Sequence, residues 1–362
     1  MLEGILALSR SMSTANKKIF STLIEFASAN NIQIRNADEI RYIKSNKPEK
    51  SIITDLKIQC RERLDRSIEF AIGKLDQRFY LIVVGPKVPE ENIGDIFEFV
   101  SMDAGWFTSI TSEMEVDIAF GVSIYETADI LNDRYRNAPS LYKGHHFSEI
   151  SQFFQPISVF VISSSSPIGD YNLHRIAGAF LCERPEFLNL EIPKDLITDY
   201  EKLFIEGPDN LPFEELLNSL TSLRWKDAFL DVYRCIERLF PYSYIQSLHN
   251  KTTPKKTIEE LIGIVEEILG WKVKENLAIE LIFSACNQQE TTLFRGVKKN
   301  VFGNEEGSIG AELIYQLRNS IVHHRLRSEQ IHKKLLIADW VSLIRGLLIV
   351  TRNEYIKYHG SI

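Results

Sequence analysis

Apolar residues are spaced in two different ways along this chain, and the change divides it into two parts. Beyond residue 213 they recur at helical intervals in five segments, near 213–240, 257–270, 273–286, 308–327 and 331–358. Short turn-like stretches separate these segments. Four or five amphipathic helices with short connections predict an antiparallel helical bundle.

The first 210 residues show a mixed pattern. Helical spacing predicts helices near 12–30, 50–75 and 90–101. The run at 79–85 is rich in β-branched and aromatic residues and ends at Gly-Pro, which predicts a buried strand, and 157–162 predicts a second one. The expected fold is therefore α+β, with a mixed α/β N-terminal domain followed by an all-α bundle.

The boundary between these parts is predicted near 205–212, where Gly207, Pro208, Asp209 and Asn210 cluster between two periodic segments. Such a cluster is typical of a linker. We therefore expect two domains, a mixed α/β domain over 1–210 and a helical domain over 211–362. The total of 362 residues agrees with two domains of ordinary size.

The composition places the chain among ordinary globular proteins, with 44% hydrophobic and 25% charged residues. The four cysteines are scattered and include no C-x-x-C pair: Cys60, Cys182, Cys235 and Cys286. This pattern argues against a disulfide framework and a zinc site, and it fits a reducing cytoplasm. The most apolar stretch, 335–350, is too short for a membrane span and contains Asp339 and Arg345. We expect a cytoplasmic protein with no membrane segment.

Charge is unevenly distributed along the chain. The formal net charge is −7, which is not typical of a general nucleic-acid binder. Residues 213–362, however, hold 20 Lys and Arg against 18 Asp and Glu, whereas residues 1–212 hold 22 against 31. The helical part is therefore less repulsive to RNA than the whole-chain charge suggests.

The predicted helix at 308–327 separates apolar from polar residues. Its apolar residues lie within about 80 degrees of Leu317 in helical projection: Ile309, Leu313, Ile314 and Ile321. The far side collects four polar residues: Glu312, Gln316, Asn319 and His323. Arg318 lies between the two faces. A site on the polar face stays open unless a second subunit covers it.

The residues Arg318-Asn319-Ser320-Ile321-Val322-His323 carry a family resemblance. They resemble the Arg-x(4–6)-His motif of the HEPN superfamily, in which a polar residue often follows the arginine. The segment 233–239 also resembles the opening helix of many such domains. The resemblance covers about 213–362 and assigns nothing to 1–212.

The resemblance implies a metal-independent ribonuclease. In active HEPN ribonucleases two bundles pair, and the ribose 2′-hydroxyl attacks the neighbouring phosphate, leaving a 2′,3′-cyclic phosphate and a 5′-hydroxyl. By this resemblance His323 is the general acid or base, since an imidazole titrates near neutral pH. Arg318 holds the scissile phosphate, and Asn319 orients the imidazole or a phosphate oxygen. The need for a 2′-hydroxyl makes RNA the substrate, with tRNA as one candidate.

Other basic residues give weaker indications. Arg325 and Arg327 follow the motif and are candidates for phosphate contact, although cations at a helix end also complement its dipole. His145 and His146 form a tempting pair, but adjacent histidines diverge and no neighbouring Cys or acidic pattern completes a ligand set. We expect no metal and no other cofactor.

The expected function is that of an endoribonuclease effector of a toxin or anti-phage defence system. The domain over 1–210 would then have a sensing or regulatory role and receive an antitoxin or activating ligand. The alternative is a catalytically inactive HEPN module that binds RNA, a nucleotide or a partner protein. We also expect a homodimer, since the catalytic interpretation needs one. The apolar helix at 331–358 is expected to be buried by the N-terminal domain or, preferably, by the dimer partner.

Overall fold

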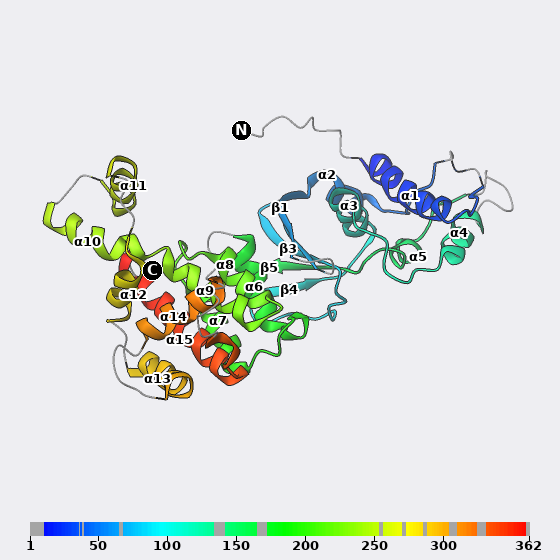
Figure 1. The fold of residues 1–362 in the computed structure, drawn as a ribbon. Helices are drawn as coiled ribbons and strands as arrows, with labels where there is room; N and C mark the ends of the chain where they lie inside the picture. Colours follow the sequence, from blue (N-terminus) through cyan, green and yellow to red (C-terminus); the bar gives the residue numbers. More distant parts are fainter. Residues whose placement is uncertain are drawn as a thin grey trace. The chain divides into compact units, whose positions relative to one another are not determined.

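The computed structural model of the chain describes residues 11–35, 37, 40–64, 68–133, 142–164, 172–252, 256–269, 273–284, 288–303, 310–323 and 331–359. The chain forms two compact units, Met1–Ser166 and Pro167–Ile362 (Figure 1). The first contains a sheet with helices and the second is helical, so the predicted α+β class is confirmed. None of the described helices is long and apolar enough to cross a membrane.

The first unit is built on an antiparallel sheet in the order β1-β2-β3-β5-β4. Its strands are β1 (Lys57–Arg63), β2 (Glu69–Leu75), β3 (Arg78–Val84), β4 (Phe97–Val100) and β5 (Ile157–Ile162). Strands β3 and β5 are the two that the sequence predicts, and both are confirmed. They pair with one another in the middle of the sheet, where apolar β-branched runs are expected.

The helices in the described part of this unit are α1 (Met12–Ala29), α2 (Lys47–Asp55), α3 (Ala104–Met114), α4 (Ile124–Asp133) and α5 (Phe147–Ser151). One apolar cluster joins α1 and α3 to the sheet, and it includes Phe20, Leu23, Phe107, Ile82 and Val159. Helix α1 begins where the Ser11 side chain accepts a hydrogen bond from the Thr14 backbone, as an N-cap should. The packing places the exposed face of α1 beside the C-terminal end of α3.

Two predicted helices of the first unit are wrong. In the segment 50–75 the helix ends at Asp55, and the chain continues into β1 and β2. The residues of β1 are mostly exposed and charged because it is an edge strand, so their spacing does not alternate as in a half-buried strand. In the segment 90–101 the only regular element is β4, whose strand structure depends on pairing with β5, about sixty residues further on.

The second unit consists of helices α6 (Leu173–Glu183), α7 (Lys194–Glu206), α8 (Phe213–Thr221), α9 (Trp225–Glu237), α10 (Phe240–Thr252), α11 (Ile258–Leu269), α12 (Glu275–Phe283), α13 (Gln288–Phe302), α14 (Ala311–Val322) and α15 (Ile337–His359), with short 3-10 turns at Pro185–Phe187 and Ile331–Lys333. Helix α15 packs against α7, α9 and α13. Leu343, Ile344 and Leu347 are completely buried there. The burial of this apolar helix is therefore supplied by its own chain, and it gives no argument for a dimer partner.

The boundary between the units differs from the expected one at residue 210. It falls between Ser166 and Pro167 because α6 and α7 pack with α8 and α15. The Gly-Pro-rich stretch that resembles a linker is a tight turn between α7 and α8. Arg175 of α6 donates hydrogen bonds to the carbonyl oxygens of Ile205 and Gly207 and to the Asp209 carboxylate. A turn fixed in this way belongs inside a folding unit.

A close approach of α2 and α3 gives a stability prediction. A methyl group at Gly105 would lie 2.4 Å from the Glu49 carbonyl oxygen, a backbone atom that cannot turn aside. Gly105→Ala is therefore expected to lower the free energy of unfolding by about 1–3 kcal/mol, measured by urea denaturation. Gly263 of α11 is the matched control, because it has no atom within 4 Å of such a methyl. Gly263→Ala is expected to stabilise by up to about 1 kcal/mol. Equal stabilisation by both changes would contradict the packing.

Candidate functional site

Helix α14 carries the motif, and its apolar stripe is confirmed except at Ile309, which lies outside the described residues. Leu313, Ile314 and Leu317 are completely buried, and Ile321 is 8% exposed. Glu312 and His323 are exposed, while Gln316 and Asn319 are half-buried. The helix therefore presents its polar face away from the core, as the helical projection predicts. It is shorter than the expected 308–327, because it ends at Val322.

The motif residues meet at the C-terminal end of α14. His323 is the C-cap, with φ −105° and ψ 101°, and its backbone N–H donates to the Asn319 carbonyl oxygen at 2.9 Å. The Arg318 guanidinium bridges the other two side chains. Its Nη1 lies 3.1 Å from Asn319 Oδ1 and 3.4 Å from His323 Nε2. The structure thus brings all three predicted residues together, with the histidine on the non-helical residue that follows the helix.

The contact between Arg318 and His323 has a consequence for the imidazole. A guanidinium only donates hydrogen bonds. His323 Nε2 accepts in this contact if the ring is neutral and carries its proton on Nδ1. In that tautomer the lone pair of Nε2 points toward the guanidinium that would hold a phosphate.

Three residues from other helices surround Arg318. Its Nε lies 3.2 Å from the Glu275 carboxylate, and its Nη2 lies 3.8 Å from that of Glu237. The guanidinium carbon is also 5.9 Å from the centre of the Tyr233 ring. Tyr233 donates its hydroxyl hydrogen bond to Glu275. These contacts fix the orientation of an arginine side chain that is only 19% exposed.

The charged groups of this cluster are one guanidinium and two carboxylates. Burial raises the pKa of Glu237, and the positive charge of Arg318 partly opposes that rise. Burial and the hydrogen bond to Glu275 raise the pKa of Tyr233, so its phenol remains a donor at neutral pH. Glu237 is the more distant of the two carboxylates. A phosphate would have to compete with it for the Arg318 guanidinium.

Sequence reasoning identified the motif and missed its supporting residues. Tyr233 and Glu237 lie in the segment 233–239 that resembles a HEPN opening helix, but nothing in that segment assigns them a role. Glu275 has no local signal, because it reaches Arg318 only through the packing of α12 on α14. The one available indication was that Tyr233 and Glu237, four residues apart, share one face of the predicted helix.

The remaining candidates fall into two groups, those outside the described residues and those that the structure places elsewhere. Arg325 and Arg327 lie outside the described residues. His332, from the 3-10 turn before α15, lies 3.3 Å from the Ser320 hydroxyl on the other side of α14. In the first unit His145 is buried against Phe20, and the side chain of His146 caps α5. Within the described ranges, no three His, Cys, Asp or Glu side chains are grouped so that they could hold a metal ion.

Comparisons with known proteins add no relationship. No family model matches the chain, and no curated protein and no solved structure is significantly similar to it.

Proposed function

We propose that this protein is a metal-independent endoribonuclease of the HEPN type, with its active site at the end of α14. The observation that carries the proposal is the meeting of Arg318, Asn319 and His323 within hydrogen-bond range on an exposed helix end. A histidine beside a guanidinium supplies a proton-transfer group next to a phosphate-binding group. Strand cleavage by a ribose 2′-hydroxyl needs this combination.

In the proposed reaction the 2′-oxygen attacks the adjacent phosphorus and the bond to the 5′-oxygen breaks. His323 Nε2 takes the proton from the 2′-hydroxyl or, when protonated, gives one to the leaving 5′-oxygen. Arg318 holds a non-bridging phosphate oxygen, whose negative charge grows in the transition state. One His323 cannot be base and acid in the same step, so the second proton transfer falls to the same motif of a second copy. The proposal therefore includes a homodimer.

The proposed role in the cell is that of a cytoplasmic effector of a toxin or anti-phage defence system. In this proposal the first unit receives the controlling signal, from an antitoxin or an activating ligand.

The decisive assay incubates the purified full chain with tRNA and with total RNA in the presence of EDTA. The proposal expects cleavage that leaves 2′,3′-cyclic phosphate and 5′-hydroxyl ends. Replacement of the ribose by 2′-deoxyribose at a mapped cleavage site is expected to protect that site. Cleavage that stops in EDTA, or products with 5′-phosphate ends, would contradict it.

One observation favours the alternative of a non-catalytic module that binds RNA, a nucleotide or a partner protein. Arg318 is already paired with Glu275 and approached by Glu237, so its charge is largely neutralised within one chain. An intact RNA that binds the protein without being cut, in every buffer tested, would support that alternative.

The two carboxylates are expected to affect cleavage in opposite directions. Glu275 contacts Arg318 through Nε and leaves Nη1 free to point toward His323, so it is a positioning residue. Glu275→Gln is expected to lower kcat for RNA cleavage about tenfold. Glu237→Gln removes the competing charge near Nη2 and is expected to lower KM. Steady-state kinetics on one RNA substrate separates these effects, and equal losses of kcat in both variants would contradict them.

A further inference from the structure

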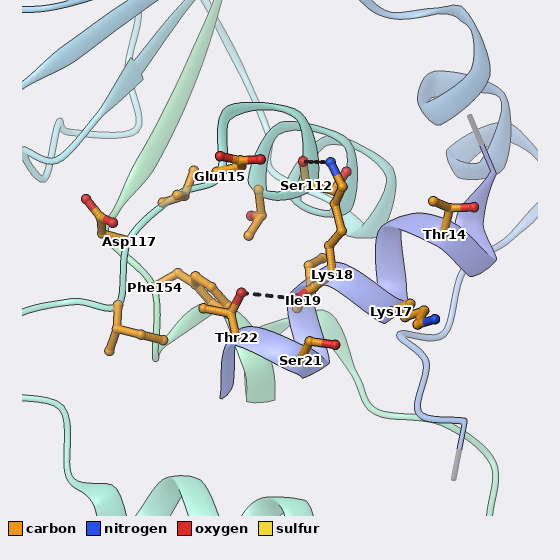
Figure 2. A pocket seen from close by; sticks show the side chains of 13 residues that line it. Thr14, Lys17, Lys18, Ile19, Ser21, Thr22, Ser112, Glu115, Asp117 and Phe154 are labelled. Carbon is orange, nitrogen blue, oxygen red and sulfur yellow. Dashed lines mark hydrogen bonds between the residues drawn. The ribbon is translucent and has the colours of Figure 1, made fainter. Parts of the chain in front are cut away.

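The first unit has a pocket of about 760 Å³ between α1 and the C-terminal end of α3 (Figure 2). One wall is formed by α1, which contributes Ile19 and a stripe of lysines and hydroxyl residues: Thr14, Lys17, Lys18, Ser21 and Thr22. These positions follow one another at helical spacing on one face. No carboxylate among the described residues pairs with either lysine. This wall is suited to an anionic group with several acceptor oxygens.

The opposite wall of the pocket carries carboxylates. Glu115 and Asp117 follow the end of α3, and Figure 2 shows them on the far side of Lys18 from Lys17 and Thr14. Asp117 pairs with Arg63 at 3.2 Å, whereas Glu115 has no cationic partner in the described part of the chain. Because Glu115 has no such partner there, its carboxylate is available to accept hydrogen bonds from hydroxyl or amino groups.

A buried hydroxyl gives independent support for a ligand. Thr111 lines the pocket, is 3% exposed, and its Oγ1 has no hydrogen-bond partner. A buried polar atom without a partner normally costs about 1–3 kcal/mol, so such atoms are uncommon unless something else satisfies them. Lys18 has only a long contact, 3.3 Å from its Nζ to the Ser112 carbonyl oxygen, and keeps two N–H groups for a ligand.

We propose that this pocket binds a nucleoside phosphate. The phosphate lies on the α1 wall, where Lys18 neutralises its charge and a hydroxyl of the same helix face supplies a donor. The ribose hydroxyls donate to Glu115, as acidic residues commonly receive them. Apolar side chains of Ile118 and Phe154 line the remaining space for the base. The volume is larger than a single amino acid fills and lies within the range of sites for larger metabolites.

Isothermal titration calorimetry on the full chain tests the proposal, with the four ribonucleoside 5′-monophosphates, adenosine and inorganic phosphate as probes. At least one monophosphate is expected to bind about tenfold more tightly than adenosine and inorganic phosphate. Lys18→Met is expected to weaken that binding about tenfold, because it removes a charge-assisted contact. Lys87→Met, at an exposed loop lysine of the same unit, is the matched control and is expected to change nothing.

Thr111→Val gives a separate test, because it is expected to affect the stability of the free protein and the binding of a nucleotide differently. Valine has nearly the same side-chain shape as threonine and lacks the buried hydroxyl that has no partner. The free protein is therefore expected to be as stable as the parent or more stable. Nucleotide binding is expected to weaken severalfold. The proposal is overturned if none of the four monophosphates binds, if adenosine binds as well as its phosphate, or if Lys18→Met and Thr111→Val bind like the parent.

Discussion

Replacement of His323 by alanine is expected to reduce RNA cleavage about 10²–10⁴-fold, the usual contribution of a general acid or base. The side chain is exposed at the end of α14, and its only described side-chain contact is the one with Arg318. The substitution therefore removes the proton-transfer group without disturbing the core. The rate is measured on one defined RNA, in EDTA, under single-turnover conditions.

The control for this variant is His249→Ala in the same unit. His249 lies on α10 and contacts the Lys256 carbonyl oxygen, far along the chain from the motif. It is expected to keep full activity. Mixing His323→Ala with Arg318→Ala protein adds a test of the shared site, since one partner keeps Arg318 and the other keeps His323. Cleavage by His323→Ala at the parental rate would remove His323 from the active site.

Replacement of Arg175 by methionine is expected to lower the free energy of unfolding of the helical unit by about 3–5 kcal/mol, because three carbonyl oxygens lose a buried donor. The side chain is 1% exposed and makes at least four hydrogen bonds. Three of them go to carbonyl oxygens at the C-terminal end of α7, those of Phe204, Ile205 and Gly207, at 2.7, 3.0 and 2.9 Å. Methionine fills much of the volume but leaves these buried acceptors without donors.

A surface arginine provides the comparison for Arg175. Arg224 pairs with Asp227 at 2.6 Å, but its side chain is 66% exposed. Arg224→Met is therefore expected to cost less than about 1 kcal/mol. The urea midpoint of each variant is followed by far-UV circular dichroism. A midpoint for Arg175→Met that equals that of Arg224→Met would mean that the turn after α7 does not depend on the buried guanidinium.

The helices and strands that could be predicted are those whose pattern is local. The stripe of α14 follows from 3.6-residue spacing alone, and so does the place of Asn319 on the opposite side, whereas His323 follows the end of the helix. The central strands β3 and β5 follow from their continuous β-branched runs. In contrast, β1 and β4 are short or exposed strands whose formation depends on a partner strand, so their local pattern misleads.

The sequence by itself determined the α+β class, the long apolar helix α15 and the grouping of Arg318, Asn319 and His323, because each depends on residues within a few helical turns. Only the tertiary structure decided three other features. It places the boundary between the units after Ser166. The reason is that Arg175 contacts the turn at 205–209, about thirty residues further along the chain. It placed Glu237 and Glu275 on Arg318, and it opened a pocket between α1 and α3. These features arise from contacts between distant segments, which hydrophobic spacing along one segment cannot encode.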